Sequence, residues 1–305
     1  MNEDFRRLTG SGARQRRQLE RGLLRVTGCD RVRFLNGMLS NDVALPAGRA
    51  CYAMQLDRKG HLVADLWVLV LEDAIWLDIA PGRAGVVREL LEKHLIADDV
   101  EIDDLGAAWG RLDFEGPDAR QIAGAPELEP GEVATDEEGR IWLAGGEVSD
   151  EGVRVYAPHE SLAVLLERTA TLELSETHAE LLRVLRMQPA YGVDMDERSF
   201  PAEARLECAV SFKKGCYIGQ EIVARIHSRG AVNRLLVQLS SDAPVSPGDA
   251  ITAGGRALGA VTSSAVSPTH GPLALGYVKR EFAAPGSEVE IARVAARVLA
   301  PPLDS

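Results

Sequence analysis

The sequence predicts an α+β fold in which two mixed domains are followed by a small β-barrel. Its length of 305 residues suits two or three domains of ordinary size. Strand-like and helix-like segments alternate up to about residue 230, and short strands separated by glycine, proline and serine follow. We therefore expect a first domain over residues 1–108, a second over 109–230 and the barrel over 231–305.

The first domain is expected to combine an antiparallel hairpin with two helices. Its predicted strands are Leu23–Val26, Cys51–Leu56, His61–Leu71 and Ala74–Ile79, and its predicted helices run over Arg31–Leu39 and from Pro81 to about Leu95. The turn residues Asp57–Gly60 separate two apolar runs, which predicts the hairpin. Pro81 suits the first turn of a helix whose apolar face carries Val87 and Leu91.

The second domain is expected to contain strands and helices as well. Strands are predicted near Ala107–Phe114, Arg140–Leu143 and Val153–Ala157, and helices over His159–Thr169 and from Ser175 to about Met187. The stretch Ala123–Gly139, rich in proline, glycine and glutamate, is interpreted as a surface loop. The acidic run from Asp98 to Asp104 is interpreted as a solvated loop and strand edge.

The chain after Gly230 shows no helical pattern. Its predicted strands are Arg234–Ser240, Ala250–Ala253, Gly259–Ser264, Leu273–Val278 and Val289–Val294. Such even spacing predicts a small closed barrel, because closure removes the exposed edges of a sheet.

The net charge, the hydrophobic stretches and the cysteine spacing limit the kinds of partner and the cellular compartment that we expect. The net charge of −12 argues against duplex nucleic acid, because binding phosphates needs a basic face. The longest apolar stretch, Leu66–Leu71, is too short to cross a membrane, and no secretory signal is visible, so we expect a cytoplasmic protein. The four cysteines lack the spacing of a metal-binding loop, and we expect reduced thiols and no stably bound metal.

The segment Lys214–Glu221, KGCYIGQE, is the most informative stretch of the chain. A strand-like run, Ala209–Phe212, precedes it, and a pattern with isoleucine at every fourth residue predicts a helix after it. Cys216 would then lie in a turn at a helix N-terminus, where free N–H groups and the helix dipole favour a thiolate. With Lys213 and Lys214 beside it, we expect a reactive thiol. The alternative is a small buried side chain in a tight corner.

Positive charge gathers around this motif although the chain is acidic. Between residues 205 and 234 six basic residues face only two acids. The basic residues are Arg205, Lys213, Lys214, Arg225, Arg229 and Arg234. The excess would suit a small anionic ligand, and a solvated basic face is the alternative.

At these positions the chain resembles a known family. The motif KGCYIGQE, with Ile222–Arg225 after it, is similar to the signature of the YgfZ-type folate-binding proteins. These are relatives of the glycine-cleavage T-protein (aminomethyltransferase) that act in iron–sulfur cluster assembly and repair. Further blocks that resemble the family are Val26–Asp30, Phe34–Gly37, Leu39–Val43, Leu56–Gly60, Tyr191–Asp194, Pro201–Glu203, Gly259–Ser263 and Leu275–Val278. The resemblance covers nearly the whole chain.

The resemblance implies the fold predicted above, with two α+β domains and a β-barrel around a central opening that binds tetrahydrofolate. It implies a monomeric folate-binding accessory protein that supports assembly or repair of iron–sulfur clusters through the Cys216 thiol, with Lys214 setting the charge of that thiol. Its partners would be folate and iron–sulfur client proteins or their assembly machinery, and any cluster contact would be transient, since one thiol cannot hold a cluster. The implied folate contacts are Gly215, Tyr217, Gly219, Gln220, Glu221, Arg225, Arg229, Arg234 and Asp65.

Two departures from the T-protein pattern bear on the chemistry. The T-protein hairpin carries two adjacent aspartates, of which only Asp65 remains here, after Ala64. A pterin-binding glutamate two residues beyond the arginine that Arg183 matches is replaced by Leu185, which cannot pair with pterin donors. Both departures weaken the alternative interpretation, a tetrahydrofolate-dependent aminomethyltransferase or other one-carbon transferase with Asp65 as base. A cysteine nucleophile paired with His227 is disfavoured, because eleven residues of one helix separate the two.

Overall fold

The computed structural model describes residues 10, 12–18, 21–230 and 232–300. Two compact units divide the chain. The two-sheet unit contains Arg7–Leu174 and Cys208–Ile222, and the barrel unit contains Ser175–Glu207 and Val223–Ser305. The KGCYIGQE motif therefore belongs to the two-sheet unit up to Gln220 and Glu221, the first residues of a helix that continues into the barrel unit.

The first sheet of the two-sheet unit is antiparallel, with strand order β3-β4-β5-β2-β6. Its strands are β2 (Gly22–Thr27), β3 (Arg49–Leu56), β4 (Leu62–Val70), β5 (Ile75–Ile79) and β6 (Glu101–Asp104), and its helices are α2 (Arg31–Met38) and α3 (Ala84–His94). One face packs against both helices through buried side chains such as Leu35, Leu66 and Val87. Burial of this apolar face is what stabilises the layer, and the predicted strands and helices are confirmed apart from their ends.

The turn between β3 and β4 is formed by local hydrogen bonds. Asp57 Oδ1 accepts the backbone N–H groups of Lys59 and His61, both at 2.8 Å. Gly60 has φ +80°, and its N–H donates to the Asp57 carbonyl at 3.0 Å. An aspartate followed by a glycine in the left-handed region is typical of a tight turn, so the predicted hairpin is confirmed.

The second sheet has strand order β1-β7-β10-β9-β8 and is also antiparallel. Its strands are β1 (Arg14–Arg17), β7 (Trp109–Glu115), β8 (Val133–Thr135), β9 (Ile141–Ala144) and β10 (Val153–Pro158), and its helices are α4 (Ala119–Ala123) and α5 (His159–Thr169). Both helices pack on one face. The edge strands β1 and β8 were not predicted; β1 comes from the range assigned to the first domain, and β8 lies inside the predicted loop.

The remaining faces of the two sheets pack on each other within this unit. Leu23, Leu69 and Trp76 of the first sheet form one core with Leu143 and Tyr156 of the second. Side chains alternate along a strand, so residues next to these core positions on the same faces also point into the layer between the sheets. Charged residues occupy that layer too, as described below.

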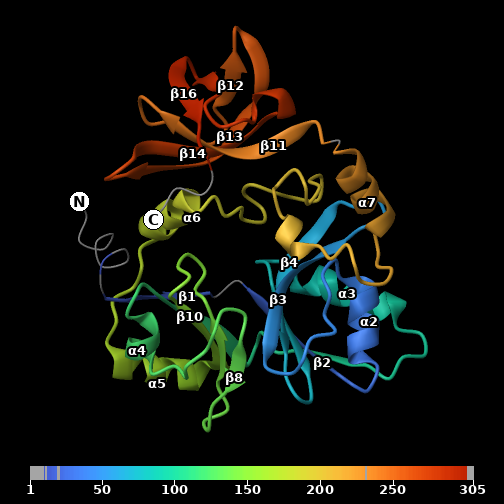
Figure 1. Ribbon diagram of the computed structural model, residues 1–305. Coiled ribbons are helices and arrows are strands. Elements are labelled where there is room, and N and C mark those ends of the chain that lie inside the picture. The colour runs from blue at the N-terminus through green and yellow to red at the C-terminus, as the bar shows by residue number, and fades with distance from the viewer. Residues whose placement is uncertain (1–9, 11, 19–20, 231, 301–305) are drawn as a thin grey trace. The chain divides into compact units, whose positions relative to one another are not determined.

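The barrel unit contains two helices and a closed barrel in the order β11-β14-β13-β12-β15-β16, drawn in orange and red in Figure 1. Its elements are α6 (Glu176–Leu185), α7 (Gln220–Arg229), β11 (Arg234–Ser241), β12 (Ala250–Ala253), β13 (Arg256–Ser267), β14 (Gly271–Lys279), β15 (Glu288–Ile291) and β16 (Val294–Val298). The predicted barrel is confirmed with one difference. The segment predicted as a single last strand turns at Ala292 and Arg293, both in the left-handed region, and forms two strands.

The predicted strand over residues 209–212 is wrong. A short 3-10 helix covers Glu207–Ala209, and the following residues form no strand. The backbone here pairs with Ser40 instead: Ser40 Oγ donates to the Ala209 carbonyl at 2.6 Å, and the Ser211 N–H donates to the Ser40 carbonyl at 3.0 Å. Within the described ranges, no helix is long and apolar enough to cross a membrane.

Candidate functional site

The hairpin strand β4 places an acid on the sheet face opposite its helices. Asp65 and Trp67 share this face, whereas Ala64 and Leu66 point into the core between sheet and helices. Asp65 is buried, with 7% of its surface exposed. The hydroxyl of Tyr52, on β3, donates to Asp65 Oδ2 at 2.8 Å. Oδ1 is buried and has no hydrogen-bond partner among the described residues, so one oxygen of the carboxyl has its hydrogen-bonding capacity unmet.

The surroundings of Asp65 favour its protonated form. Burial raises the pKa of the carboxyl, and the charge of Glu147 adds to this, whereas Arg21 and the Tyr52 hydroxyl oppose it. Burial also raises the pKa of Tyr52 well above its usual range, so the phenol remains a hydrogen-bond donor. A buried carboxyl with a raised pKa and one unpaired oxygen is typical of a general acid or base.

A buried ion network lies in the same layer between the two sheets. Its members are Arg21, Asp78, Arg111, Asp113 and Glu147. Asp78 accepts from Arg21 Nε at 2.5 Å, from Arg111 Nη1 at 2.8 Å and from the Tyr156 hydroxyl at 2.8 Å. Arg111 also donates to both oxygens of Asp113, at 2.7 and 2.8 Å, and to Glu147. The network joins both sheets and fixes the layer into which Asp65 points.

Lys214 of the motif binds backbone carbonyls at the C-terminal end of helix α2. Lys214 Nζ donates to the carbonyls of Asn36, Leu39 and Asn41 at 2.6, 2.7 and 2.7 Å. These carbonyls lie at or just beyond the end of α2, where the helix leaves its last acceptors unpaired. Burial lowers the pKa of Lys214 to about 8, but three carbonyl acceptors require three N–H donors and so favour the ammonium form.

Three further motif residues are packed against the first domain. Tyr217 is buried with its ring 5.0 Å from Lys214 Nζ, and Ile218 joins the core beneath α2. Gly219 has φ +85°, and a Cβ there would lie 2.6 Å from the Asp57 carbonyl oxygen. Only glycine fits this contact with the hairpin turn. The glycine at position 219 is therefore explained by the packing of the segment against the hairpin.

Cys216 is the exposed member of the motif. A Cβ on the neighbouring Gly215 would meet nothing within 4 Å, so the loop here is open. We expected Cys216 in a turn at a helix N-terminus. Helix α7 begins at Gln220, and the turn before it covers residues 218 and 219, so the thiol lies just ahead of that turn. Lys214 points its ammonium at carbonyls of the α2 end. A reactive thiolate at Cys216 therefore stays a prediction, whereas the exposure of Cys216 to solvent is observed.

The other predicted contacts lie on α7 and the barrel. Gln220 and Glu221 open α7, and Arg225 is exposed further along it. The side chain of Arg229 lies outside the described part of the chain. Arg234, on β11, donates to Glu203 at 3.1 Å and stacks 4.5 Å above the Tyr277 ring, within the barrel unit. These positions stay predictions as folate contacts.

Leu185, which departs from the T-protein pattern, and Arg183, which matches it, both have structural roles. Leu185 is buried at the end of α6, and its carbonyl accepts from Gln238 Nε2 at 3.1 Å. Arg183 donates to Asp194 at 2.5 Å and to Ser263 at 2.5 Å, which ties α6 to the barrel. Both residues are thus engaged within the barrel unit.

Asp65 is a predicted site residue, whereas its surroundings were not predicted. Tyr52, Trp67 and the ion network were not singled out, because their contacts join segments that are distant in sequence. One signal was available: Asp65 and Asp78 interrupt strands that are otherwise apolar. A charged residue in the middle of a buried strand indicates a buried partner or a functional group.

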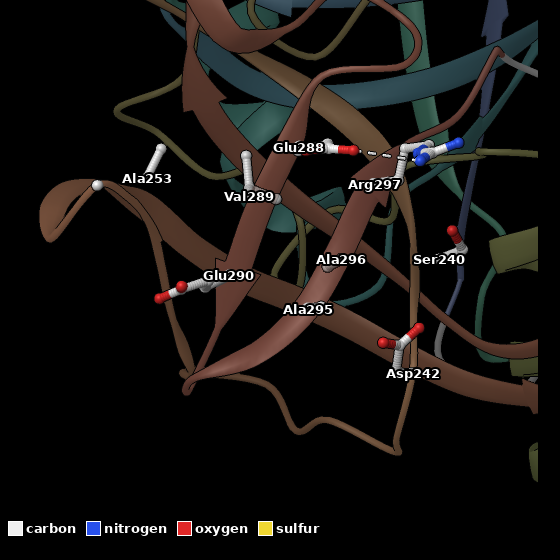
Figure 2. Close-up of a pocket in the computed structure, with 10 residues that line it drawn as sticks. Ser240, Asp242, Ala253, Glu288, Val289, Glu290, Ala295, Ala296 and Arg297 are labelled. Atoms are coloured by element: carbon white, nitrogen blue, oxygen red, sulfur yellow. Dashed lines mark hydrogen bonds and ion pairs between the residues drawn. The ribbon is translucent and has the colours of Figure 1, made fainter.

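A recess on the barrel holds none of the predicted site residues. Figure 2 shows Asp242, Glu288 and Glu290 around it, with Arg297 paired to Glu288 at 3.3 Å. Its lining is mainly acidic side chains and small apolar ones, which on their own indicate no ligand. Among the described residues, no group of three or more histidine, cysteine or acidic side chains is placed to hold a metal ion.

Two family models match the chain. The GCVT N-terminal domain matches residues 20–131, and the glycine cleavage T-protein C-terminal barrel domain matches residues 234–304. Together they cover more than half of the chain. The first model includes the hairpin with Asp65, and the second includes nearly the whole barrel.

Relatives and a solved structure agree with these matches. The chain is 28% identical over 287 residues to a putative chloroplastic transferase of Arabidopsis thaliana, covering 88% of this chain and 66% of that one. It is 27% identical over 307 residues to an aminomethyltransferase of Symbiobacterium thermophilum, covering 88% and 79% of the two chains. The crystal structure of the glycine cleavage system aminomethyltransferase T from Bartonella henselae superposes with a TM-score of 0.88 at 24% identity, over 96% of this chain and 86% of that one. This likeness shows the fold.

Proposed function

The chain belongs to the glycine cleavage T-protein-like family, and from this premise we propose that it is a tetrahydrofolate-dependent one-carbon transferase of the aminomethyltransferase type. The observation that supports the proposal is the Asp65 carboxyl, held by Tyr52 through one oxygen and unpaired at the other. An acid in this state can exchange a proton with a nitrogen of a bound ligand.

The residues around Asp65 fit tetrahydrofolate. The rings of Tyr52 and Trp67 lie beside the carboxyl with their centroids 5.4 Å apart, and both side chains are partly exposed. An aromatic surface next to an unpaired buried acceptor suits a planar ring that carries N–H groups. Tetrahydrofolate, when bound, supplies a ring nitrogen that carries the one-carbon unit.

Asp65 exchanges the proton, and Tyr52 holds one oxygen of the Asp65 carboxyl. Tyr52 remains a donor and keeps Oδ2 engaged, so proton exchange with a bound amine is confined to Oδ1. Because burial raises the pKa of Asp65, the carboxyl holds a proton more readily than an exposed aspartate does. Such a group can protonate a departing amine and later take the proton back.

A second candidate function is favoured by the exposed Cys216. Anchoring of Lys214, Tyr217 and Gly219 fixes the motif and leaves the thiol at its surface. This arrangement suits transient contact with an iron–sulfur client, the role that the YgfZ-type resemblance implies. Folate would then be bound without being turned over, and the thiol instead of Asp65 would carry the function.

Two variants separate the candidates. We expect purified wild type and Cys216→Ser to release tetrahydrofolate from methylene-tetrahydrofolate by transferring the one-carbon unit, with water, to a candidate amine as its N-hydroxymethyl adduct. Asp65→Asn should lower the turnover rate about 10²- to 10⁴-fold, the usual contribution of a general acid or base. Asp103→Asn is the matched control, because Asp103 is a half-exposed acid on β6 paired with Arg25 at 2.8 Å.

The accessory role predicts the reverse pattern in cells that lack the protein. Iron–sulfur enzyme activity should be restored by wild type and Asp65→Asn but lost with Cys216→Ala, and Cys29→Ala, also an exposed thiol, is the control. Absence of turnover in the wild type, combined with this cellular pattern, would overturn the transferase proposal and support the second candidate.

A further inference from the structure

A second buried side chain on the Asp65 surface has unmet hydrogen-bonding capacity. Arg154, on β10, is 3% exposed. Its guanidinium stacks on Trp67, with Cζ 4.4 Å from the ring centroid, and Nη2 donates to the Gly146 carbonyl at 2.5 Å. Nε and Nη1 are both buried and have no acceptor among the described residues. Buried donors of a charged group almost always find a partner in folded proteins, so an acceptor from outside the chain is expected here.

Arg154 and Asp65 flank the same aromatic surface. Trp67 lies two residues beyond Asp65 on β4 and carries the Arg154 guanidinium on its ring. Tyr52 is the register partner of Trp67 and donates to Asp65. Unpaired donors and an unpaired acceptor therefore border one stacking platform, a combination suited to a flat, polar-edged heterocycle.

The charge balance selects a neutral acceptor over an anion. Three arginines share this layer with three carboxylates that contact them: Arg21, Arg111 and Arg154 with Asp78, Asp113 and Glu147. Although burial opposes it, Arg111, Arg21 and Arg154 hold the pKa of Glu147 well below its usual range, so this acid stays ionised. The positive charge of Arg154 is thus already matched. A formal anion would add an uncompensated buried charge, whereas a carbonyl oxygen would not.

We propose that Arg154 is a specificity-determining residue that donates to the ring carbonyl of a 4-oxopteridine. This inference rests on the proposed use of tetrahydrofolate. In such a ring the 4-carbonyl and nitrogen N5 lie on one edge, so a donor to the carbonyl also presents N5 to the neighbouring acid. Arg154 selects and orients the cofactor in this way, and Asp65 handles the proton.

The test compares folic acid with aminopterin, which differ at position 4 by an oxo or an amino group. An amino group is a donor and would face the donors of Arg154. Titrations followed by quenching of tryptophan fluorescence should give the wild type at least about tenfold tighter binding of folic acid, about 1.4 kcal/mol. Arg154→Met keeps a stem of similar length without donors and should bring the ratio of the two affinities close to one.

Two controls keep the result interpretable. Arg140→Met removes another ring-stacked arginine, 5.4 Å above Trp142, and should leave the ratio unchanged. Arg154→Lys retains a donor and should give an intermediate ratio, which decides the matter if Arg154→Met does not fold. Equal wild-type affinity for both ligands, or an unchanged ratio in the Arg154 variants, would overturn this inference alone. Failure of the wild type to bind folic acid, aminopterin and tetrahydrofolate would overturn the proposed function and this assignment with it.

Discussion

At the scale of single residues, buried carboxyls in the two-sheet unit divide into ionised and protonated members. Arg21 and Arg111 lower the pKa of Asp78 against the effect of burial. Glu115 differs: burial and the charge of Asp113 raise its pKa to about 8, although the N–H groups of Glu147 and Val148 and the charge of Arg154 oppose this rise. The balance between burial and the neighbouring charges thus decides the protonation state of each acid.

Glu115 should make stability fall with rising pH. Its pKa is raised in the folded state, so its contribution is fully present below about 4.5, the ordinary value, and is lost as pH rises through about 8. Urea unfolding at pH 5 and pH 8 should show a loss for the wild type, on the order of a few kcal/mol, that Glu115→Gln lacks. Other titrating groups are common to both proteins and cancel in the comparison. Parallel pH profiles for the two proteins would show that Glu115 ionises normally.

At the scale of elements, the segment Lys214–Glu221 packs against the β3–β4 hairpin and the end of helix α2. The segment is recognisable in the sequence because glycines, a lysine and a cysteine coincide in it. The roles of these residues are not predictable from the sequence, because the carbonyls that Lys214 binds lie more than 170 residues earlier in the chain. The contacts divide the motif into anchors, such as Lys214 and Gly219, and an exposed thiol at Cys216.

Gly219→Ala should disrupt the contact between this segment and the β3–β4 hairpin. The substitution combines a left-handed backbone with a Cβ 2.6 Å from the Asp57 carbonyl oxygen, and we expect a loss of about 2 kcal/mol or more in the free energy of unfolding. Gly215→Ala is the matched control, because a Cβ there meets nothing within 4 Å. Urea denaturation of both variants measures the difference, and equal stability would contradict the docking role of Gly219.

At the scale of the whole molecule, the sequence predicted the regular elements better than the contacts between them. The hairpin, helices and barrel strands follow from apolar periodicity and turn residues. Strand β1, with sequence RQRR, has no apolar alternation and exists because it pairs with β7. Strand β6 is acidic and is held by β2, where Arg25 pairs with Asp103. Edge strands of this kind depend on distant partners, so their own residues do not reveal them.

The same limit applies to the candidate site. Asp65 was predicted because it lies on a recognisable hairpin and matches one of the two hairpin aspartates of the T-protein. Tyr52, Trp67 and Arg154 became visible only when β3, β4 and β10 were placed around one layer. The site is thus a product of sheet pairing and of the packing of two sheets.

The most direct test of this account is the titration of the Asp65 carboxyl by NMR. Protein labelled with ¹³C at aspartate carboxyls, assigned with Asp65→Asn, would be titrated with and without tetrahydrofolate. We predict a pKa above the ordinary 3.8 in the free protein and a clear change in the Asp65 signal when tetrahydrofolate is added. An ordinary pKa together with a signal that tetrahydrofolate leaves unmoved would contradict the central claim that Asp65 is the proton-handling group of a folate site.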